Sequence, residues 1–522
     1  MTATTPNIHP RLTTLEVLGV GLSVEMFRQS QVWQEMQEHQ KGSILPEDAA
    51  AYSRKHDAKA IATTKRSANA LESSAKYFVE NWPIPSVSVW PRQHSAASSD
   101  AANPFNDRID SLREAAGMPH HKISPLSAFF SDNPEEILER AFQFFEGYPD
   151  VPALLLLMSD GDMTRSLTGD ASRQAHWEDG PRRFDSMAES MVGLLLARRE
   201  RVDAIRAFAG HPGNHLYAPG PPKPGFKPSK FVPEVWTHEQ FQQFDRLPTI
   251  AVLHRPVRIT YRKDKDGNPT FDPGKQVKLM SERQKGEAFK IGFDAALQSI
   301  PGGEPARVFY DTAGPVTGAN VIPLAQAVTA SLPDFALFKP ETGIDIYARI
   351  GNTGAASPFV QWALAIIAAF QEKDASITAN LRQDEEATIT VVTPSTDKRP
   401  YTLADPIDFH LSPNELLYTQ PVSVSVPVGA PSVRQPDQPE SMRTLAIGAR
   451  HLSGEECRQS GMWRCDPPHY EHGDTHYIRA WSTFPQVHVA RKLNAMQKLR
   501  GEAQLQKVTA HWTLVSYEMP KS

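Results

Sequence analysis

The chain has 522 residues, with 55 basic and 60 acidic side chains and a formal net charge of −5 at pH 7. This length predicts two to four domains with large apolar cores and excludes a small scaffold held together by disulfides. The charge balance disfavours nucleic acid or an anionic membrane as the main partner. The only two cysteines lie beyond residue 456, which indicates a reducing compartment.

No targeting or membrane-spanning segment is expected. The N-terminal residues lack a basic region followed by an apolar one, and the apolar stretch 15–26 is interrupted by Glu16 and Glu25. The strongest apolar run, residues 151–158, is too short to cross a bilayer. We therefore expect a soluble, cytoplasmic protein.

The first half of the chain mixes helical and strand patterns. Residues 24–39 have apolar positions near helical spacing, and residues 84–91 alternate as a short strand. An N-cap and proline at 133–134 predict a helix that ends at Gly147. Residues 151–158 then form a continuous apolar run, typical of a strand buried on both faces of a parallel sheet.

The second half repeats this alternation after a segment rich in proline and glycine at 210–235. The predicted order is strand 256–262, helix 281–299, strand 306–310, a further helix, strand 344–350, a small-residue turn at 351–357, helix 359–371 and strand 387–393. Alternating strands and helices with short connections predict an α/β sheet protein.

A proline-rich linker and a compact terminal piece follow. We divide the chain into an N-terminal α/β half (1–235), a C-terminal α/β half (236–410), a linker (411–443) and a small, mainly β module (444–522). The module shows helical periodicity only within 489–506.

Common catalytic and nucleotide-binding motifs are missing. The sequence has no G-x-S-x-G elbow and no phosphate-binding G-x-x-x-x-G-K-[ST] loop. Gly19-Val20-Gly21 lacks the third glycine of a dinucleotide-binding turn. We therefore predict no catalytic residue and no cofactor.

Two short segments allow both a functional and a structural interpretation. Asp160-Gly161-Asp162 follows the apolar strand, where two carboxylates could hold a hard cation or simply turn the chain and cap the next helix. Residues 351–357 lie between a strand and an apolar helix, whose free N–H groups could receive an anion. Their small side chains could also serve close packing alone.

The cysteines allow three interpretations. Cys457 and Cys465 could bind zinc with His469, His472 or His476, form a disulfide, or remain buried thiols. Seven residues separate them, whereas paired zinc ligands usually stand two to four residues apart. We predict a structural role for both and no metal.

The order of elements in residues 281–393 resembles the thiolase and ketoacyl-synthase superfamily. In that superfamily a strand leads into a turn of the G-H-[ST]-x-G-A-A-[GS] kind and then an apolar helix, and this chain has Gly351-Asn352-Thr353-Gly354-Ala355-Ala356-Ser357. The resemblance implies a thiolase-like, pseudo-duplicated α/β core. Asn352 replaces the turn histidine and residues 1–456 contain no cysteine, so the covalent step of acyl transfer is not expected. Asp311, Thr312, Asn352 and Thr353 are the candidates for a degenerate pocket.

A larger part of the chain resembles the type VI lipase adapter family. The resemblance rests on LGVGLSVEMFRQSQVWQEM near the N-terminus, PEEILERAFQFFEGYPDVPALLLLMSDGD at 134–162 and ADPIDFHLSP at 404–413. It implies a non-catalytic cytoplasmic adaptor that binds a phospholipase effector and delivers it to the type VI secretion spike. Neither nucleic acid nor membrane is an expected partner.

The terminal module resembles a C-x2-[ST]-G-x-W-x-C module of type VI toxin-associated and immunity proteins. Cys457, Ser460, Gly461, Trp463 and Cys465 carry the match. Two alternatives to the adaptor therefore remain: an immunity protein that neutralises a toxin, and a thiolase-like acyl-transfer enzyme.

Overall fold

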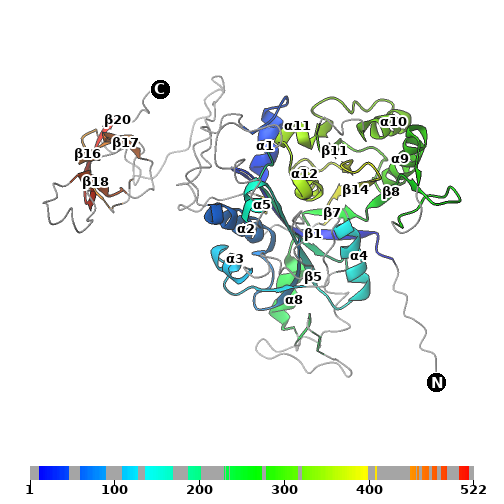
Figure 1. The fold of residues 1–522 in the computed structure, drawn as a ribbon. Helices are drawn as coiled ribbons and strands as arrows, with labels where there is room; N and C mark the ends of the chain where they lie inside the picture. The colour runs from blue at the N-terminus through cyan, green and yellow to red at the C-terminus, as the bar shows by residue number, and fades with distance from the viewer. Residues whose placement is uncertain are drawn as a thin grey trace, which may run out of the picture. The chain divides into compact units, whose positions relative to one another are not determined.

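The computed structural model forms two units, of which one contains the described residues up to 407 and the other those from 447 onward (Figure 1). The predicted linker 411–443 and most of segment 210–235 lie outside the described residues. The domain boundaries at these segments therefore stay predictions. The described residues are 11–45, 59–89, 109–126, 136–167, 186–200, 228–229, 231–233, 236–272, 278–314, 320–397, 406–407, 447–453, 455, 457, 461–469, 473–478, 484–490 and 505–516.

One large mixed sheet runs through the first unit. Its first half contains β1 (Thr14–Val24), β3 (Pro83–Val89), β4 (Lys122–Pro125), β5 (Ala153–Asp160) and β6 (Ser190–Ala197). Its second half contains β7 (Ala251–His254), β11 (Arg307–Asp311), β12 (Gly343–Asp345), β13 (Ser376–Asn380) and β14 (Glu386–Pro394). Short β2 (Phe27–Arg28) pairs with β1, and β8 (Val257–Thr260) pairs with β14, while β9 (Arg262–Lys263) and β10 (Lys278–Leu279) form a separate ribbon.

The two halves have the same topology. The spatial orders are β4-β3-β5-β6-β1 and β12-β11-β13-β14-β7, and antiparallel pairing of β1 with β7 joins them. In each half the outer three strands are parallel and the inner pairs are antiparallel. The predicted duplicated α/β core is therefore confirmed. The sheet is mixed, because buried β5 pairs in parallel with β3 but antiparallel with β6.

The helices repeat in the same way around the strands. Helices α2, α3 and α4 of the first half occupy the same places in strand order as α9, α10 and α12 of the second. The helices are α1 (Ser30–Glu38), α2 (Lys59–Ala75), α3 (Ile109–Ala115), α4 (Ile137–Gly147), α5 (Asp162–Leu167), α8 (His238–Arg246), α9 (Glu282–Leu297), α10 (Val321–Ser331), α11 (Ile346–Ile350) and α12 (Ser357–Glu372), with the 3-10 turn η6 (Gly354–Ala356).

Two sequence predictions need correction. The helix expected over 24–39 begins only at Ser30, because β1 continues to Val24 and Gln29 has a positive φ of 50°. The strand expected over 344–350 ends at Asp345. The carboxylate of Asp345 accepts a hydrogen bond from the Ala348 N–H at 3.2 Å, which caps and starts α11.

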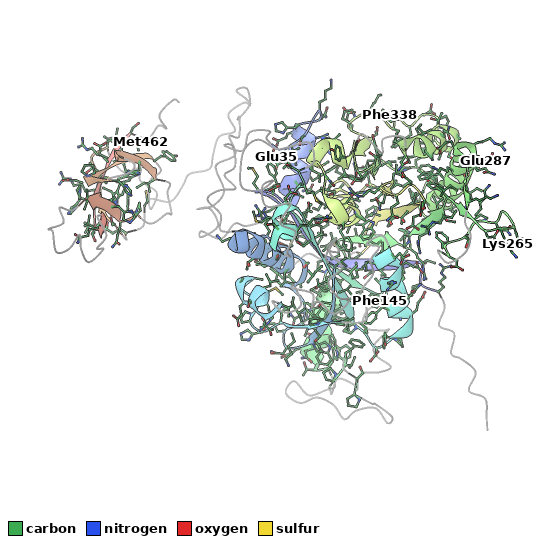
Figure 2. All side chains as sticks on the ribbon, in the orientation of Figure 1. Glu35, Phe145, Lys265, Glu287, Phe338 and Met462 are labelled. Atoms are coloured by element: carbon green, nitrogen blue, oxygen red, sulfur yellow. The ribbon has the colours of Figure 1, made fainter. Side chains whose placement is uncertain are left out.

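Helix α12 is the centre of the core. Its residues from Ser357 to Ala369 are all buried, and it contacts strands of both halves, including β1, β6, β13 and β14. The stretch Gly354–Glu372 is long and apolar enough to cross a membrane by length and composition, but 83% of it is buried inside the protein. It is therefore an interior helix. Figure 2 shows the packed side chains, with Phe145 inside and Glu287 and Phe338 at the periphery.

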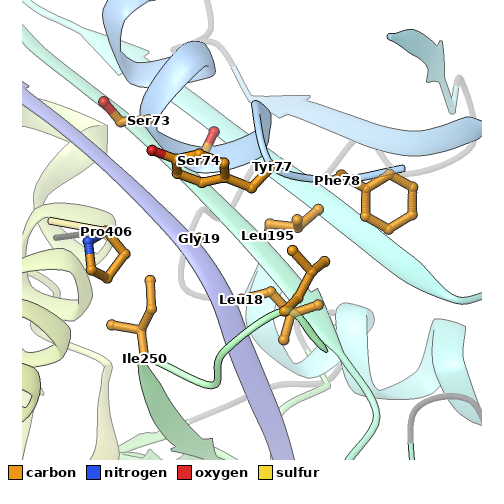
Figure 3. A pocket seen from close by; sticks show the side chains of 10 residues that line it. Leu18, Gly19, Ser73, Ser74, Tyr77, Phe78, Leu195, Ile250 and Pro406 are labelled. Carbon is orange, nitrogen blue, oxygen red and sulfur yellow. The ribbon is translucent and has the colours of Figure 1, made fainter. Parts of the chain in front are cut away.

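Three glycines on β1 and β6 allow α2 to pack closely against the sheet. A Cβ on Gly19 or Gly21 would lie 1.9 Å from the carbonyl oxygen of Ser74 or Ala70, which are backbone atoms of α2. A Cβ on Gly193 of β6 would lie 2.5 Å from Ser74 Oγ. The Gly19-Val20-Gly21 segment therefore serves close helix–sheet packing. The small pocket in Figure 3 lies beside this helix–sheet contact, between Gly19, the end of α2 and Pro406.

An arginine joins the two halves at the edge of the core. Arg255, which follows β7, donates to Glu139 and Glu146 of α4, with its Nη1 2.7 Å from Glu146 Oε1. Its guanidinium also lies over the Phe142 ring, 5.3 Å from the centroid. The hydrogen bonds to Glu139 and Glu146 raise the pKa of Arg255 above its usual value.

The second unit is a small β module. Strands β15 (Arg450–Leu452), β20 (His511–Ser516), β16 (Gly461–His469) and β17 (Gly473–Ile478) form one sheet in this order, and β18 (Val487–Ala490) pairs with β19 (Leu505–Val508). Trp463, Trp512 and Phe484 fill its core. The predicted β character is confirmed. The two ends of segment 489–506 lie in β18 and β19, and its middle is outside the described residues.

Replacing Gly21 with valine should strongly destabilise the first unit, because the new Cβ meets helix backbone that cannot move aside. We expect a loss of about 3 kcal/mol or more in urea unfolding. Gly147→Ala is the control, since a Cβ there meets nothing within 4 Å and φ is not positive. Equal stabilities for the two variants would contradict the close packing of α2 against Gly21.

Candidate functional site

The two segments that could hold ions meet at the start of α12. Asp160, the last residue of β5, is fully buried, and its Oδ2 accepts a hydrogen bond from the Ala355 N–H at 2.7 Å. The Gly161 N–H donates to its Oδ1 at 2.8 Å. The helix start that could have received an external anion is thus occupied by the protein's own carboxylate.

Gly354 makes this approach possible. Its φ is +56°, and a Cβ there would lie 2.1 Å from Asp160 Oδ2 and 2.2 Å from Met187 Cε. Asn352 supports the turn, because its Oδ1 accepts from the Gly354 N–H at 3.0 Å and its carbonyl accepts from the Ala188 N–H at 2.8 Å. The small-residue turn therefore serves packing and capping.

Arg165 balances the buried charge of Asp160. Its Nε and Nη2 donate to the two carboxylate oxygens, each at 2.8 Å, in a bidentate pair. Asp162 is engaged elsewhere, accepting from the Met187 N–H at 2.9 Å. Among the described residues, no group of three His, Cys, Asp or Glu side chains is placed to hold a metal ion.

Two of the four predicted pocket residues, Asp311 and Asn352, accept hydrogen bonds from Arg382. Asp311 Oδ2 accepts from Arg382 Nη1 at 2.8 Å and from the Ser357 hydroxyl, and its Oδ1 accepts from the Ala313 N–H at 2.7 Å. Asn352 Oδ1 lies 3.3 Å from Arg382 Nη2. Arg382 therefore brings Asp311 and Asn352 into one network.

The two threonines of the pocket are buried as well. Thr312 is 5% exposed and donates to the Gly314 carbonyl at 3.4 Å, while Thr353 is fully buried. Thr353 Oγ1 has no partner among the described residues. Asp160 and Asp311 each accept hydrogen bonds from an arginine and from a backbone N–H, an arrangement that favours structural hydrogen bonding over general-base chemistry.

Sequence reasoning missed another buried acidic residue, Glu189. Glu189, just before β6, accepts from the Thr164 N–H at 3.1 Å and from the Thr164 hydroxyl at 2.9 Å, which holds the start of α5. Burial raises its pKa to about 7; nearby Arg66 lowers the value and Glu25 raises it. The only sequence signal for this buried acid was its position between Met187-Ala188 and the apolar residues of β6.

The structure describes most of the residues of the motif predicted in the terminal module. Cys457 and Cys465 are not joined by a disulfide, and both are buried in the module core with Trp463. Gly461 begins β16, where a Cβ would lie 2.4 Å from the Ser516 carbonyl oxygen. Ser460 lies outside the described residues. The structural role of the cysteines stays a prediction.

Family comparison decides the identity of the two halves. The N-terminal family description of the type VI lipase adapter protein Tla3 matches residues 13–179, and the C-terminal one matches residues 250–394. The chain belongs to this family. The two matches cover most of the duplicated sheet, and the predicted resemblance is confirmed.

Solved structures with a similar chain course are thiolase-like enzymes. A ketosynthase from module 1 of the bacillaene synthase of Bacillus amyloliquefaciens is 10% identical, with a TM-score of 0.37 over 75% of this chain and 77% of that one. The ishigamide ketosynthase/chain length factor is 12% identical, with a TM-score of 0.38 over 73% and 99%. A variant of OleA from Xanthomonas campestris is 11% identical, with a TM-score of 0.34 over 74% and 100%. Likeness this low carries no information on activity.

Asp160→Asn should destabilise the first unit, because it removes the anion from the bidentate pair with Arg165 and weakens the hydrogen bond from Ala355 at the start of α12. We expect a loss of about 2–3 kcal/mol in denaturant unfolding. Asp110→Asn, which breaks a surface pair with Arg113 (84% exposed acid), should cost under about 0.5 kcal/mol. A neutral Asp160→Asn variant would argue against the buried cap.

Glu189 should give stability a measurable pH dependence. Its folded pKa of about 7 lies above the ordinary value of 4.5, so folding favours the protonated acid. This stabilisation is complete below about pH 4.5 and is lost as the pH rises through 7, by roughly 3 kcal/mol. Glu189→Gln should remove that slope in unfolding curves between pH 5 and 8, whereas exposed Glu114→Gln should keep it. Identical slopes for Glu189→Gln and the parent would contradict the assignment.

Proposed function

We propose that this protein is a cytoplasmic adaptor that binds a phospholipase effector without covalent chemistry and delivers it to the type VI secretion spike. The observation that carries the proposal is the match of the type VI lipase adapter family to both halves of the core. The membership supports lipase binding, and delivery to the spike is the further step that we propose.

The geometry at α12 supports a non-catalytic role. Asp160 fills the helix start, Arg382 and Ser357 engage Asp311, and Asn352 stands where thiolase-like enzymes would have histidine. Residues 1–456 contain no cysteine. An acyl-transfer site would need a reactive nucleophile with an activating base, and these residues supply neither.

An adaptor must instead present a surface. A complex with a folded lipase should bury on the order of 1,200–2,000 Å². The first unit is large enough for such an interface, and the separate β module offers a second binding unit for effector or spike. The immunity-protein alternative shares the terminal motif but predicts direct inhibition of the toxin.

Co-purification tests the adaptor role. Tagged full-length protein should retain a phospholipase effector from the same genome through size-exclusion chromatography, and it should not retain an effector of another enzymatic class. The spike protein should join the complex when added. In parallel, the purified chain should hydrolyse neither acyl-CoA nor ester substrates above background.

Two results would overturn the proposal. One is thioester turnover that Asn352→Ala abolishes, in a chain that binds no effector, which would establish the enzyme alternative. The other is stoichiometric inhibition of the lipase without any binding to the spike, which would establish the immunity alternative.

A further inference from the structure

A polar seam lies in the core between α12 and the second half of the sheet. On adjacent strands β13 and β14, Thr378 pairs with Thr390 and Asn380 pairs with Thr388, so all four side chains lie on one face. Each is at most 6% exposed. Apolar residues would be expected there, since α12 covers this face.

Helix α12 faces the seam with polar residues one turn apart. Ser357 and Gln361 are 0% and 1% exposed, and Gln361 Nε2 donates to Ser357 Oγ at 3.2 Å. The Ser357 hydroxyl donates in turn to Asp311, which Arg382 also contacts. This series of hydrogen bonds fixes the amide of Gln361 with its nitrogen toward Ser357.

A cavity of about 10 Å³ lies within this seam. Its lining consists of Pro358, Gln361, Trp362, Thr378, Asn380, Thr388 and Thr390. Two polar atoms at the lining, Gln361 Oε1 and Thr390 Oγ1, have no partner among the described residues. Buried polar atoms are nearly always satisfied in folded proteins.

We propose that this cavity binds one ordered water molecule that donates to Gln361 Oε1 and hydrogen-bonds to Thr390 Oγ1. The volume is that of a single water, and the lining provides the two to four polar partners that a buried water needs. An apolar ligand would leave both atoms unsatisfied, and a larger polar ligand would not fit. This inference does not depend on the proposed function.

A crystal structure of the full-length protein at high resolution tests the site directly. We expect one density peak about 2.7–3.2 Å from both Gln361 Oε1 and Thr390 Oγ1. A dry cavity at a resolution where other buried waters are visible would overturn the proposal.

A pair of variants tests it by the sign of a stability change. Thr390→Val keeps the side-chain shape but removes a partner of the water, so the melting temperature of the first unit should fall by about 1–3 °C. Ser376→Ala is the control: Ser376 Oγ is on the same face, has no partner among the described residues and does not line the cavity. Its melting temperature should stay or rise. If Thr390→Val behaves like Ser376→Ala, Thr390 has no water to lose and the proposal is wrong.

Discussion

The hydrogen bond from the Ala355 N–H to the Asp160 carboxylate is the contact on which the core depends. Helix α12 is buried along most of its length, so its first N–H groups need partners inside the protein. Asp160, from the first half of the chain, accepts a hydrogen bond from Ala355 in η6, the 3-10 turn that leads into α12, and Arg165 offsets the cost of burying that charge. Because Asp160 belongs to the first half and Ala355 to the second, this contact links the two halves of the core.

This solution has a consequence for function. A helix start that faces a cavity can bind an external anion, but here a side chain of the protein already completes it. Gly354 has no side chain because Asp160 takes that space. The core therefore has a fixed internal cap at the place where an anion could have bound.

Local patterns were enough to predict several elements, because their signals lie within one segment. The apolar run of β5 and the helix α12 were found from composition and spacing alone. The strand β1 was missed, because Glu16 and the two glycines Gly19 and Gly21 interrupt its apolar residues, so it has no continuous apolar run like that of β5. The contact between Asp160 and Ala355 was out of reach, because 195 residues separate the partners and neither segment alone reveals the other.

The polar residues of α12 explain how so apolar a helix keeps one position. A uniformly apolar surface can slide or rotate against a sheet at little cost, whereas a buried hydrogen bond is lost on any shift. Ser357 and Gln361 lie one turn apart and face the polar strands β13 and β14, while Asp311 fixes Ser357. The remaining turns of α12 make apolar contacts with both halves of the sheet. The apolar residues of α12 therefore supply most of its packing energy, and its few polar residues fix its position against the sheet.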